Sequence, residues 1–190
     1  MVKKVINETL VFWVAAVVIF ADQYTKYLVR ANLAFNQSWN PPAWLAPYAR
    51  ILHTRNSGAA FGMFKDASLL FAVIAILVSV VIIYYAMRLP AGLWWIRIVL
   101  GMQLGGALGN LIDRLLFAGK VTDFISVTIP VIRYDFAVFN VADASISMGV
   151  ALLILTMWFE GRSAKKPTSA EPPPAVEDAS QPHPGEAARP

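Results

Sequence analysis

The sequence predicts a membrane protein, mainly α-helical, whose core is a bundle of four transmembrane helices. Apolar residues make up 57% of the 190 residues and charged residues only 15%, which is not the composition of a soluble domain. The apolar residues gather in four blocks, Leu10–Val29, Ser68–Met87, Leu93–Ile112 and Phe139–Phe159. Each block is close to the roughly 20 residues that a helix needs to cross a hydrocarbon core of about 30 Å.

The composition also excludes several kinds of catalytic site. The chain has no cysteine, so disulfides, thiolate metal ligands and cysteine nucleophiles are ruled out together. Only two histidines are present, His53 and His183, which leaves little material for a zinc site or a Ser-His-Asp triad. We therefore predict no metal site and no cofactor. We interpret the net charge of +4 as Lys and Arg flanking membrane helices, because no basic patch alternates with aromatic residues as in a nucleic-acid-binding surface.

The first apolar block begins like a secretory signal peptide, because Lys3 and Lys4 stand just before it. The pattern runs on past Ala21 into a longer helix, so we interpret the block as a transmembrane span. Asp22 and Lys26 lie four residues apart in it and therefore share a helix face. An internal ion pair is the favoured interpretation of these two residues, and a direct part in the chemistry is the alternative.

The long connection over residues 30–67 contains several prolines and two tryptophans, Trp39 and Trp44. Tryptophan prefers the membrane interface, so we expect this segment to lie along the bilayer surface. Its last part holds Asn56 and Gly58 among other small residues. This pattern suits backbone that approaches a ligand closely, and it fits a plain turn equally well.

The second apolar block is apolar on every side and is expected to form a wall of the bundle. A turn at residues 89–92 returns the chain, and Trp94 marks the membrane interface. The third block then carries Gly101, Gly105 and Gly109 at steps of four. Such a stripe lets another helix approach backbone to backbone.

Three polar residues follow this glycine stripe within about one helical turn: Asn110, Asp113 and Arg114. Asn110 is therefore a neighbour of both charged residues on the helix surface. The two charged residues could form a cluster at the end of the helix in the membrane interface. Alternatively, the three groups could brace catalytic carboxylates or bind substrate, and the sequence leaves both interpretations open.

The segment over residues 121–145 contains the strongest candidates for chemistry. Asp123 lies in a β-branched run, broken by Pro130, that predicts a short edge strand or an extended loop, and Asp143 lies at the start of the fourth block. Carboxylates near a bilayer are costly, which makes them functional candidates. If the two side chains meet, they would share one proton, as in an aspartic protease dyad. Asp135 is a competing carboxylate, but its surroundings resemble a solvated turn.

A second interpretation of Asp143 comes from its spacing to Asn140. An Asn at the N-cap with an acid three residues later imitates a capping box, and a helix N-terminus favours negative charge. Capping and catalysis therefore both remain open for Asp143. The two roles are compatible, because the helix dipole would help to keep the carboxylate ionised.

The distribution of basic residues predicts that both termini face the cytoplasm. Lys3 and Lys4 precede the first span, and Arg162, Lys165 and Lys166 follow the fourth. In this arrangement the polar residues of the apolar blocks and the loops fall toward the outer face. They are Asp22, Lys26, Asn56, Asn110, Asp113, Arg114, Asp123, Asn140 and Asp143.

The composition divides the chain into two parts. Residues 1–160 are predicted to form one integral membrane domain with four spans. Residues 161–190 contain seven prolines and almost no large apolar side chain, so we predict a disordered cytoplasmic tail.

Five short motifs follow one another along the chain: DQYTK (22–26), NSGAAF (56–61), GGALGNLIDR (105–114), VTDF (121–124) and FNVADASI (139–146). Together they resemble the motifs of one family, lipoprotein signal peptidase, also called signal peptidase II. The resemblance covers nearly all of residues 10–160, and five ordered motifs are far more specific than any one of them.

This resemblance implies an aspartic endopeptidase of the bacterial inner membrane that removes the signal peptide from diacylglyceryl-modified prolipoproteins, just before the lipidated cysteine. It implies that Asp123 and Asp143 are the catalytic residues. It also implies a small extracytoplasmic β-cradle and a short surface helix beside the four spans, and inhibition by globomycin-type cyclic peptides. We expect a monomer. The residues expected to support the site or to bind substrate are Asn56, Gly58, Asn110, Asp113, Arg114, Asn140, Asp22 and Lys26.

Two other classes of function fit some of these features. A small transporter or proton relay would also place carboxylates within helices, but it should show an internal repeat and broken helices, and the sequence has neither. A non-catalytic membrane scaffold would need the glycine stripe and no pair of carboxylates.

Overall fold

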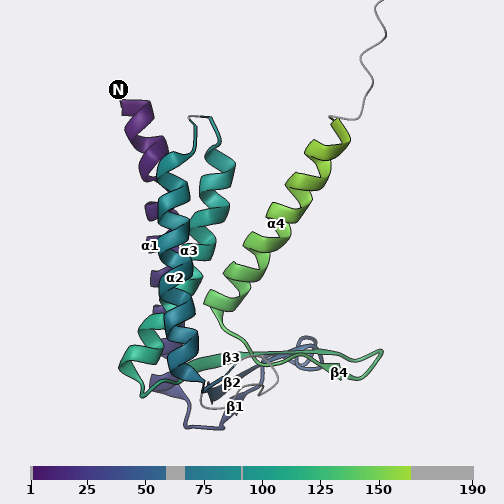
Figure 1. Ribbon diagram of the computed structural model, residues 1–190. Coiled ribbons are helices and arrows are strands. Elements are labelled where there is room, and N and C mark those ends of the chain that lie inside the picture. Colours follow the sequence, from purple (N-terminus) through teal and green to yellow (C-terminus); the bar gives the residue numbers. More distant parts are fainter. Residues whose placement is uncertain (1, 59–66, 91, 164–190) are drawn as a thin grey trace, which may run out of the picture.

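The computed structural model describes residues 2–58, 67–90 and 92–163, and it contains four long helices with a small sheet at one end (Figure 1). The helices are α1 (Val2–Asn32), α2 (Ser68–Arg88), α3 (Trp94–Leu116) and α4 (Val141–Ser163). All four are long and apolar enough to cross a membrane. The predicted four-span bundle is therefore confirmed, with α1 extending further in both directions than its apolar block.

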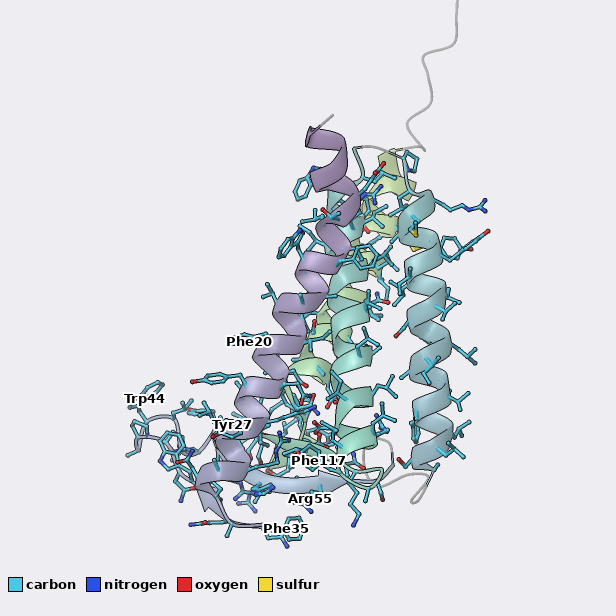
Figure 2. All side chains as sticks on the ribbon, turned by 90° about the vertical axis from the view of Figure 1, so that its left-hand side faces the viewer. Phe20, Tyr27, Phe35, Trp44, Arg55 and Phe117 are labelled. Carbon is cyan, nitrogen blue, oxygen red and sulfur yellow. The ribbon has the colours of Figure 1, made fainter. Side chains whose placement is uncertain are left out.

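The helices expose apolar side chains, as expected of a protein whose solvent is lipid. On α1, Phe20 is 70% exposed and Tyr27 is 60% exposed, and both project from the outer side of the helix (Figure 2). α2 exposes large apolar side chains such as Leu69 and Val80, while only Ser79, Ile82 and Ala86 are buried in it. α2 is thus the predicted wall, with one narrow stripe facing the bundle.

The glycine stripe of α3 forms the contact between α3 and α1. A Cβ atom built on Gly101 would lie 2.7 Å from the carbonyl oxygen of Val11, and one on Gly105 would lie 2.8 Å from the carbonyl oxygen of Ala15. On Gly109 it would lie 2.8 Å from an oxygen of the Asp22 carboxylate. The predicted backbone-to-backbone approach is therefore confirmed, and its partner is α1.

A four-stranded antiparallel sheet lies across one end of the bundle, in the order β1 (Ser38–Trp39), β2 (Ala49–Asn56), β3 (Val121–Ile129) and β4 (Tyr134–Asp135). The prediction for residues 121–138 was correct in proposing a strand but wrong in placing it at an edge, because β3 pairs with both β2 and β4. Pro130 does not prevent this pairing, since it follows the last residue of β3.

Two further segments differ from the sequence-based expectations. The first part of the segment expected to approach a ligand or to form a turn belongs to strand β2, which ends at Asn56. Ser57 and Gly58 form a bend, and the small residues that follow lie outside the described residues. The short surface helix is absent from the described part of the chain: residues 43–48 form turns, in which Leu45 and Ala46 donate to the carbonyl of Pro42.

Figure 1 places the N-terminus and the C-terminal end of α4 at the same end of the bundle, opposite the sheet. α4 runs to Ser163, three residues into the predicted tail, and residues 164–190 lie outside the described residues.

The first testable prediction concerns the contact between α1 and α3. Gly105→Ala should lower the free energy of unfolding by about 1–3 kcal/mol, because its Cβ would lie 2.7 Å from the Cβ of Val18 and 2.8 Å from a backbone oxygen. Thermal unfolding in detergent measures the effect. Gly149→Ala is the matched control, since its Cβ would meet mainly the flexible Gln103 side chain at 3.0 Å. Equal losses in the two variants would contradict the prediction.

Candidate active site

A cavity of about 630 Å³ lies where the sheet meets α2, α3 and α4. Both polar and apolar side chains line it. The polar residues that line it come from β2, α3, β3 and α4: Asn56, Asn110, Arg114, Asp123, Asp143 and Ser147. The apolar lining includes Phe71, Val121, Phe136, Phe139, Ile146 and Met148.

Asp123 reaches this cavity from the middle of the sheet, where it pairs with Thr54 of β2. Its side chain is only 3% exposed. One carboxylate oxygen accepts a hydrogen bond of 2.7 Å from the Asn140 amide, and the Asn56 side chain also hydrogen-bonds to the carboxylate. Burial, assisted by the nearby charge of Asp143, raises the pKa of Asp123 from its ordinary value of 3.8 to about 7.

Asp143 lies in the first turn of α4, where it completes the predicted capping box with Asn140. The backbone N–H of Asp143 donates to the Asn140 side-chain oxygen at 2.9 Å, and the backbone N–H of Asn140 donates to the Asp143 carboxylate at 3.2 Å. The other carboxylate oxygen accepts a hydrogen bond of 2.7 Å from the Asn110 amide. The capping interpretation of Asp143 is therefore confirmed, and the same residue also lines the cavity.

Asn140 joins the two carboxylates. Its amide nitrogen donates to Asp123, and its amide oxygen accepts from the first turn of α4, which carries Asp143. The structure therefore brings Asp123 and Asp143, twenty positions apart in sequence, to one cavity with one residue bridging them.

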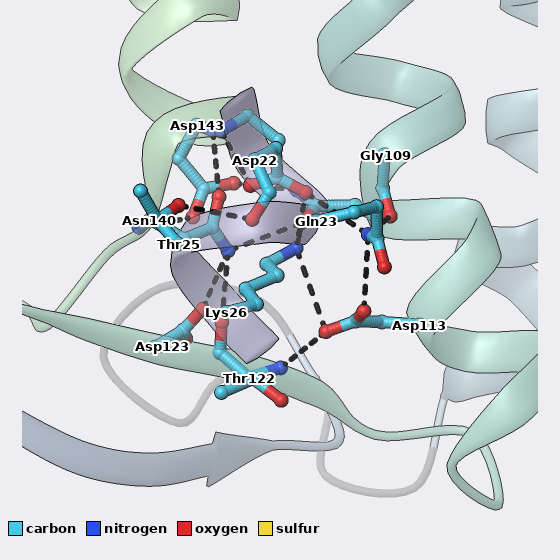
Figure 3. A network of polar contacts seen from close by, with 12 residues as sticks. Asp22, Gln23, Thr25, Lys26, Gly109, Asp113, Thr122, Asp123, Asn140 and Asp143 are labelled. Atoms are coloured by element: carbon cyan, nitrogen blue, oxygen red, sulfur yellow. Dashed lines mark hydrogen bonds and ion pairs between the residues drawn. The ribbon is translucent and has the colours of Figure 1, made fainter. Parts of the chain in front are cut away.

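Behind this pair lies a buried network of charged and amide groups (Figure 3). The ammonium group of Lys26 is fully buried and lies 2.8 Å from Asp22 and 3.5 Å from Asp113. It also donates a hydrogen bond of 2.9 Å to the side-chain oxygen of Asn110. The predicted ion pair of Asp22 and Lys26 is therefore confirmed, and it is part of a larger cluster.

The two acids of this network also hold neighbouring elements in place. Asp22 accepts a hydrogen bond of 2.9 Å from the backbone N–H of Ala142, in the first turn of α4. Asp113 accepts one of 2.8 Å from the backbone N–H of Thr122 in β3. Of the two interpretations of Asp113, the structure therefore favours bracing, because Asp113 is fully buried and holds the strand next to Asp123.

Arg114, Asn56 and Gly58 all line the cavity, as the prediction of a shared site requires. The Arg114 guanidinium lies 5.4 Å from the centre of the Phe71 ring and interacts electrostatically with Asp123 and Asp143. Its buried Nε–H has no hydrogen-bond partner among the described residues. The Asn56 side-chain oxygen accepts a hydrogen bond from the Gly58 N–H, which leaves the amide nitrogen to face Asp123.

Sequence reasoning missed several members of the site. Gln23 donates to Asp22, to Asp113 and to the carbonyl of Gly109. The only sequence signal for these contacts was the place of Gln23 in the polar DQYTK motif. Arg30 lies 3.7 Å from Asp113 and 4.4 Å from the centre of the Phe117 ring.

Two further observations concern the competing carboxylate Asp135 and metal binding. Asp135, the competing carboxylate, is exposed on β4 and accepts a hydrogen bond from Thr128, away from the cavity. Among residues 2–58, 67–90 and 92–163, no group of three His, Asp or Glu side chains is placed to hold a metal ion.

Comparison with known proteins gives a consistent result. The family model for signal peptidase (SPase) II matches residues 14–159. The lipoprotein signal peptidase of Anoxybacillus flavithermus is 40% identical over 159 residues, covering 82% of this chain and 89% of the relative. That of Bacillus subtilis is 37% identical over 157 residues, covering 83% and 98%. A bacterial membrane enzyme solved by the in meso method at 2.3 Å matches with a TM-score of 0.71 and 30% identity, over 85% of this chain and 94% of that one.

The buried network yields a second prediction. Asp22→Asn should lower the free energy of unfolding by about 3 kcal/mol, because it removes one of the two acids that balance the buried Lys26. The rate of reaction per folded molecule should fall much less. Thermal unfolding and turnover of the same preparation give the two numbers, and an intact fold without activity would contradict this assignment.

The pKa of Asp123 yields a third prediction. Because the folded protein holds a proton on Asp123 up to about pH 7, whereas the unfolded chain releases it near pH 3.8, stability should fall as the pH rises between these values. Asp123→Asn should remove most of this slope. Unfolding midpoints of both proteins measured across the window test the prediction, and parallel curves would refute it.

Proposed function

The chain belongs to the signal peptidase II family of membrane aspartic peptidases, which removes signal peptides from prolipoproteins, and from this premise we propose that Asp123 and Asp143 are its catalytic pair. The single observation that carries the proposal is that both carboxylates line one cavity, each hydrogen-bonded, with Asn140 between them. We further propose that cleavage falls just before the diacylglyceryl-modified cysteine.

The chemistry follows from the different surroundings of the two acids. At neutral pH the pair holds one proton, because burial and mutual repulsion disfavour the doubly ionised state. The ionised carboxylate takes a proton from water as the water oxygen attacks the scissile carbonyl carbon, and the protonated carboxyl gives its proton to the carbonyl oxygen. When the C–N bond of the tetrahedral intermediate breaks, a proton passes to the leaving amine. No covalent enzyme intermediate forms.

The cavity has the two surfaces that such a substrate needs. Phe71, Ile146 and Met148 provide apolar surface between α2 and α4, suited to a signal segment and to acyl chains that remain in lipid. On the polar side, Asn56 and Arg114 have N–H groups that can bind the peptide backbone or the developing oxyanion. One such donor can be worth about 3 kcal/mol in the transition state.

We propose that the enzyme lies in the bacterial inner membrane, with both termini in the cytoplasm and the sheet on the outer side. Lys3 and Lys4 lie at the end opposite the sheet, which supports this orientation. At the sheet end, the side chains of Trp39 and Trp44 are 54% and 74% exposed, as expected of side chains in the membrane interface, and Figure 2 shows Trp44 there.

We also propose that the enzyme acts as a monomer and that globomycin-type cyclic peptides bind in the cavity.

The fourth prediction tests the catalytic pair. Asp123→Asn and Asp143→Asn should each lower the rate of cleavage by at least about 10³-fold, because each variant loses one of the two groups that transfer protons. The assay is cleavage of a diacylglyceryl-modified prolipoprotein by the purified enzyme in lipid. Asp135→Asn, an equivalent change at an exposed acid outside the cavity, is the control and should cleave normally. Normal turnover in either folded variant of the pair would exclude the proposal.

A further inference from the structure

The hydrogen bonds of Asn110 connect the buried ammonium group of Lys26 to Asp143. The Asn110 side-chain oxygen accepts from Lys26 at 2.9 Å and from the Asn140 amide at 3.1 Å. Its side-chain nitrogen donates to Asp143 at 2.7 Å. Lys26, Asn110 and Asp143 belong to α1, α3 and α4 respectively, so this chain of contacts crosses the bundle from α1 through α3 to α4.

The orientation of the Asn110 side-chain amide follows from the hydrogen-bonding groups of its neighbours. An ammonium group has three donors and no acceptor, so Asn110 must present its oxygen to Lys26. Once the oxygen faces Lys26, the amide N–H must face the opposite side, where Asp143 lies. A charged donor on the oxygen also polarises the amide, which strengthens the N–H as a donor. Lys26 thereby orients and strengthens the hydrogen bond from Asn110 to Asp143 without touching the carboxylate.

The Asp143 carboxylate has two further favourable electrostatic interactions. It accepts the backbone N–H of Asn140, and it lies at the N-terminus of α4, where the helix dipole stabilises negative charge. It is also less deeply buried than Asp123. Burial therefore disfavours ionisation of Asp123 more strongly.

The other charged groups around the pair do not distinguish Asp143 from Asp123 in this way. Arg114 of α3 interacts with both carboxylates, and it is the one cation that lines the cavity in the described part of the chain. Asp22 and Asp113 are turned toward Lys26 and toward backbone N–H groups of α4 and β3. The positive charge of Lys26 also acts on Asp123. The Asn110 amide, however, contacts Asp143 directly, whereas the hydrogen bonds from Lys26 reach Asp123 only through a second amide, that of Asn140.

We propose that Lys26 is a positioning residue that acts through the Asn110 amide on the Asp143 carboxylate, so that Asp143 takes the proton from water and Asp123 delivers one to the scissile carbonyl. This inference rests on the proposed function of the pair. It adds the direction of proton transfer and identifies the group that sets it.

The two amides that face the carboxylates allow a matched test, the fifth prediction. Asn110 donates to Asp143, and Asn56 hydrogen-bonds to Asp123, so Asn110→Ala and Asn56→Ala each remove one amide from one acid. The profile of kcat/KM against pH should be bell-shaped, with a lower limb where the base ionises and an upper limb where the acid loses its proton. Asn110→Ala should move the lower limb upward by about one pH unit, and Asn56→Ala should move the upper limb upward instead.

The possible results separate the alternatives. If the effects are exchanged, with Asn110→Ala moving the upper limb, then Asp143 holds the proton and the proposed direction is wrong. If activity falls in both variants while neither limb moves, the amides act only on the structure and the proposal fails. Failure of the proposed function itself would look different, since the wild-type enzyme would then not cleave the prolipoprotein at all.

The role of Lys26 is tested by adding its substitutions to the same assay. Lys26→Gln should move the lower limb in the same direction as Asn110→Ala, and Lys26→Arg, which keeps the charge, should bring it back. In the double variant of Lys26→Gln and Asn110→Ala the limb should move no further than in Asn110→Ala alone, because the effect passes through that amide. An additive shift, or no shift in Lys26→Gln, would overturn the positioning role.

Loss of stability is controlled separately. Arg97 is a buried cation at the other end of the bundle, where it donates to the carbonyls of Ala86 and Leu89. Arg97→Gln should lower the unfolding temperature without moving either limb. If Lys26→Gln does not fold, Asn110→Ala still decides the direction of transfer, because it leaves the ion pairs of Lys26 with Asp22 and Asp113 in place.

Discussion

The buried ammonium group of Lys26 is the interaction on which the rest of the structure depends. Asp22 and Asp113 balance its charge, and these two acids in turn hold the first turn of α4 and the strand β3. Removal of one partner from a buried ion pair leaves an uncompensated charge, which typically costs about 3–5 kcal/mol. A single cation therefore fixes the relative positions of the elements that carry Asp123 and Asp143.

Most of the fold could be predicted from the sequence because lipid imposes strict rules on helix length and composition. Each apolar block had to be a helix of about 20 residues, and the structure has one at each place. The sheet was harder to predict. β2 has no clean alternation of apolar and polar residues, and its partner β3 lies about 70 positions further along the chain, so neither the strand nor its pairing has a local signal. The inner position of β3 depends on this same pairing.

In the candidate site, too, contacts between residues close in sequence could be predicted, and contacts between distant residues could not. The capping box of Asn140 and Asp143 and the ion pair of Asp22 and Lys26 are local, with spacings of three and four residues, and spacing alone was enough to predict them. The contacts of Asn110 with Lys26 and with Asp143 join residues 84 and 33 positions apart. An amide carries no charge that would indicate such partners, so its function as a connector appears only in three dimensions.

The capping role and the proposed chemical role of Asp143 also explain each other. In a low-dielectric environment an unsatisfied N–H at a helix end is costly, so the first turn of α4 needs acceptors with good geometry. Asn140, Asp143 and Asp22 provide them, which fixes the Asp143 carboxylate by the same bonds that begin the helix. A catalytic carboxylate must be held within a fraction of an ångström, and here the requirement for helix capping already supplies that precision. Because the pair lies where a helix begins beside the sheet, and not in the middle of a span, the cavity lies at the sheet end of the bundle.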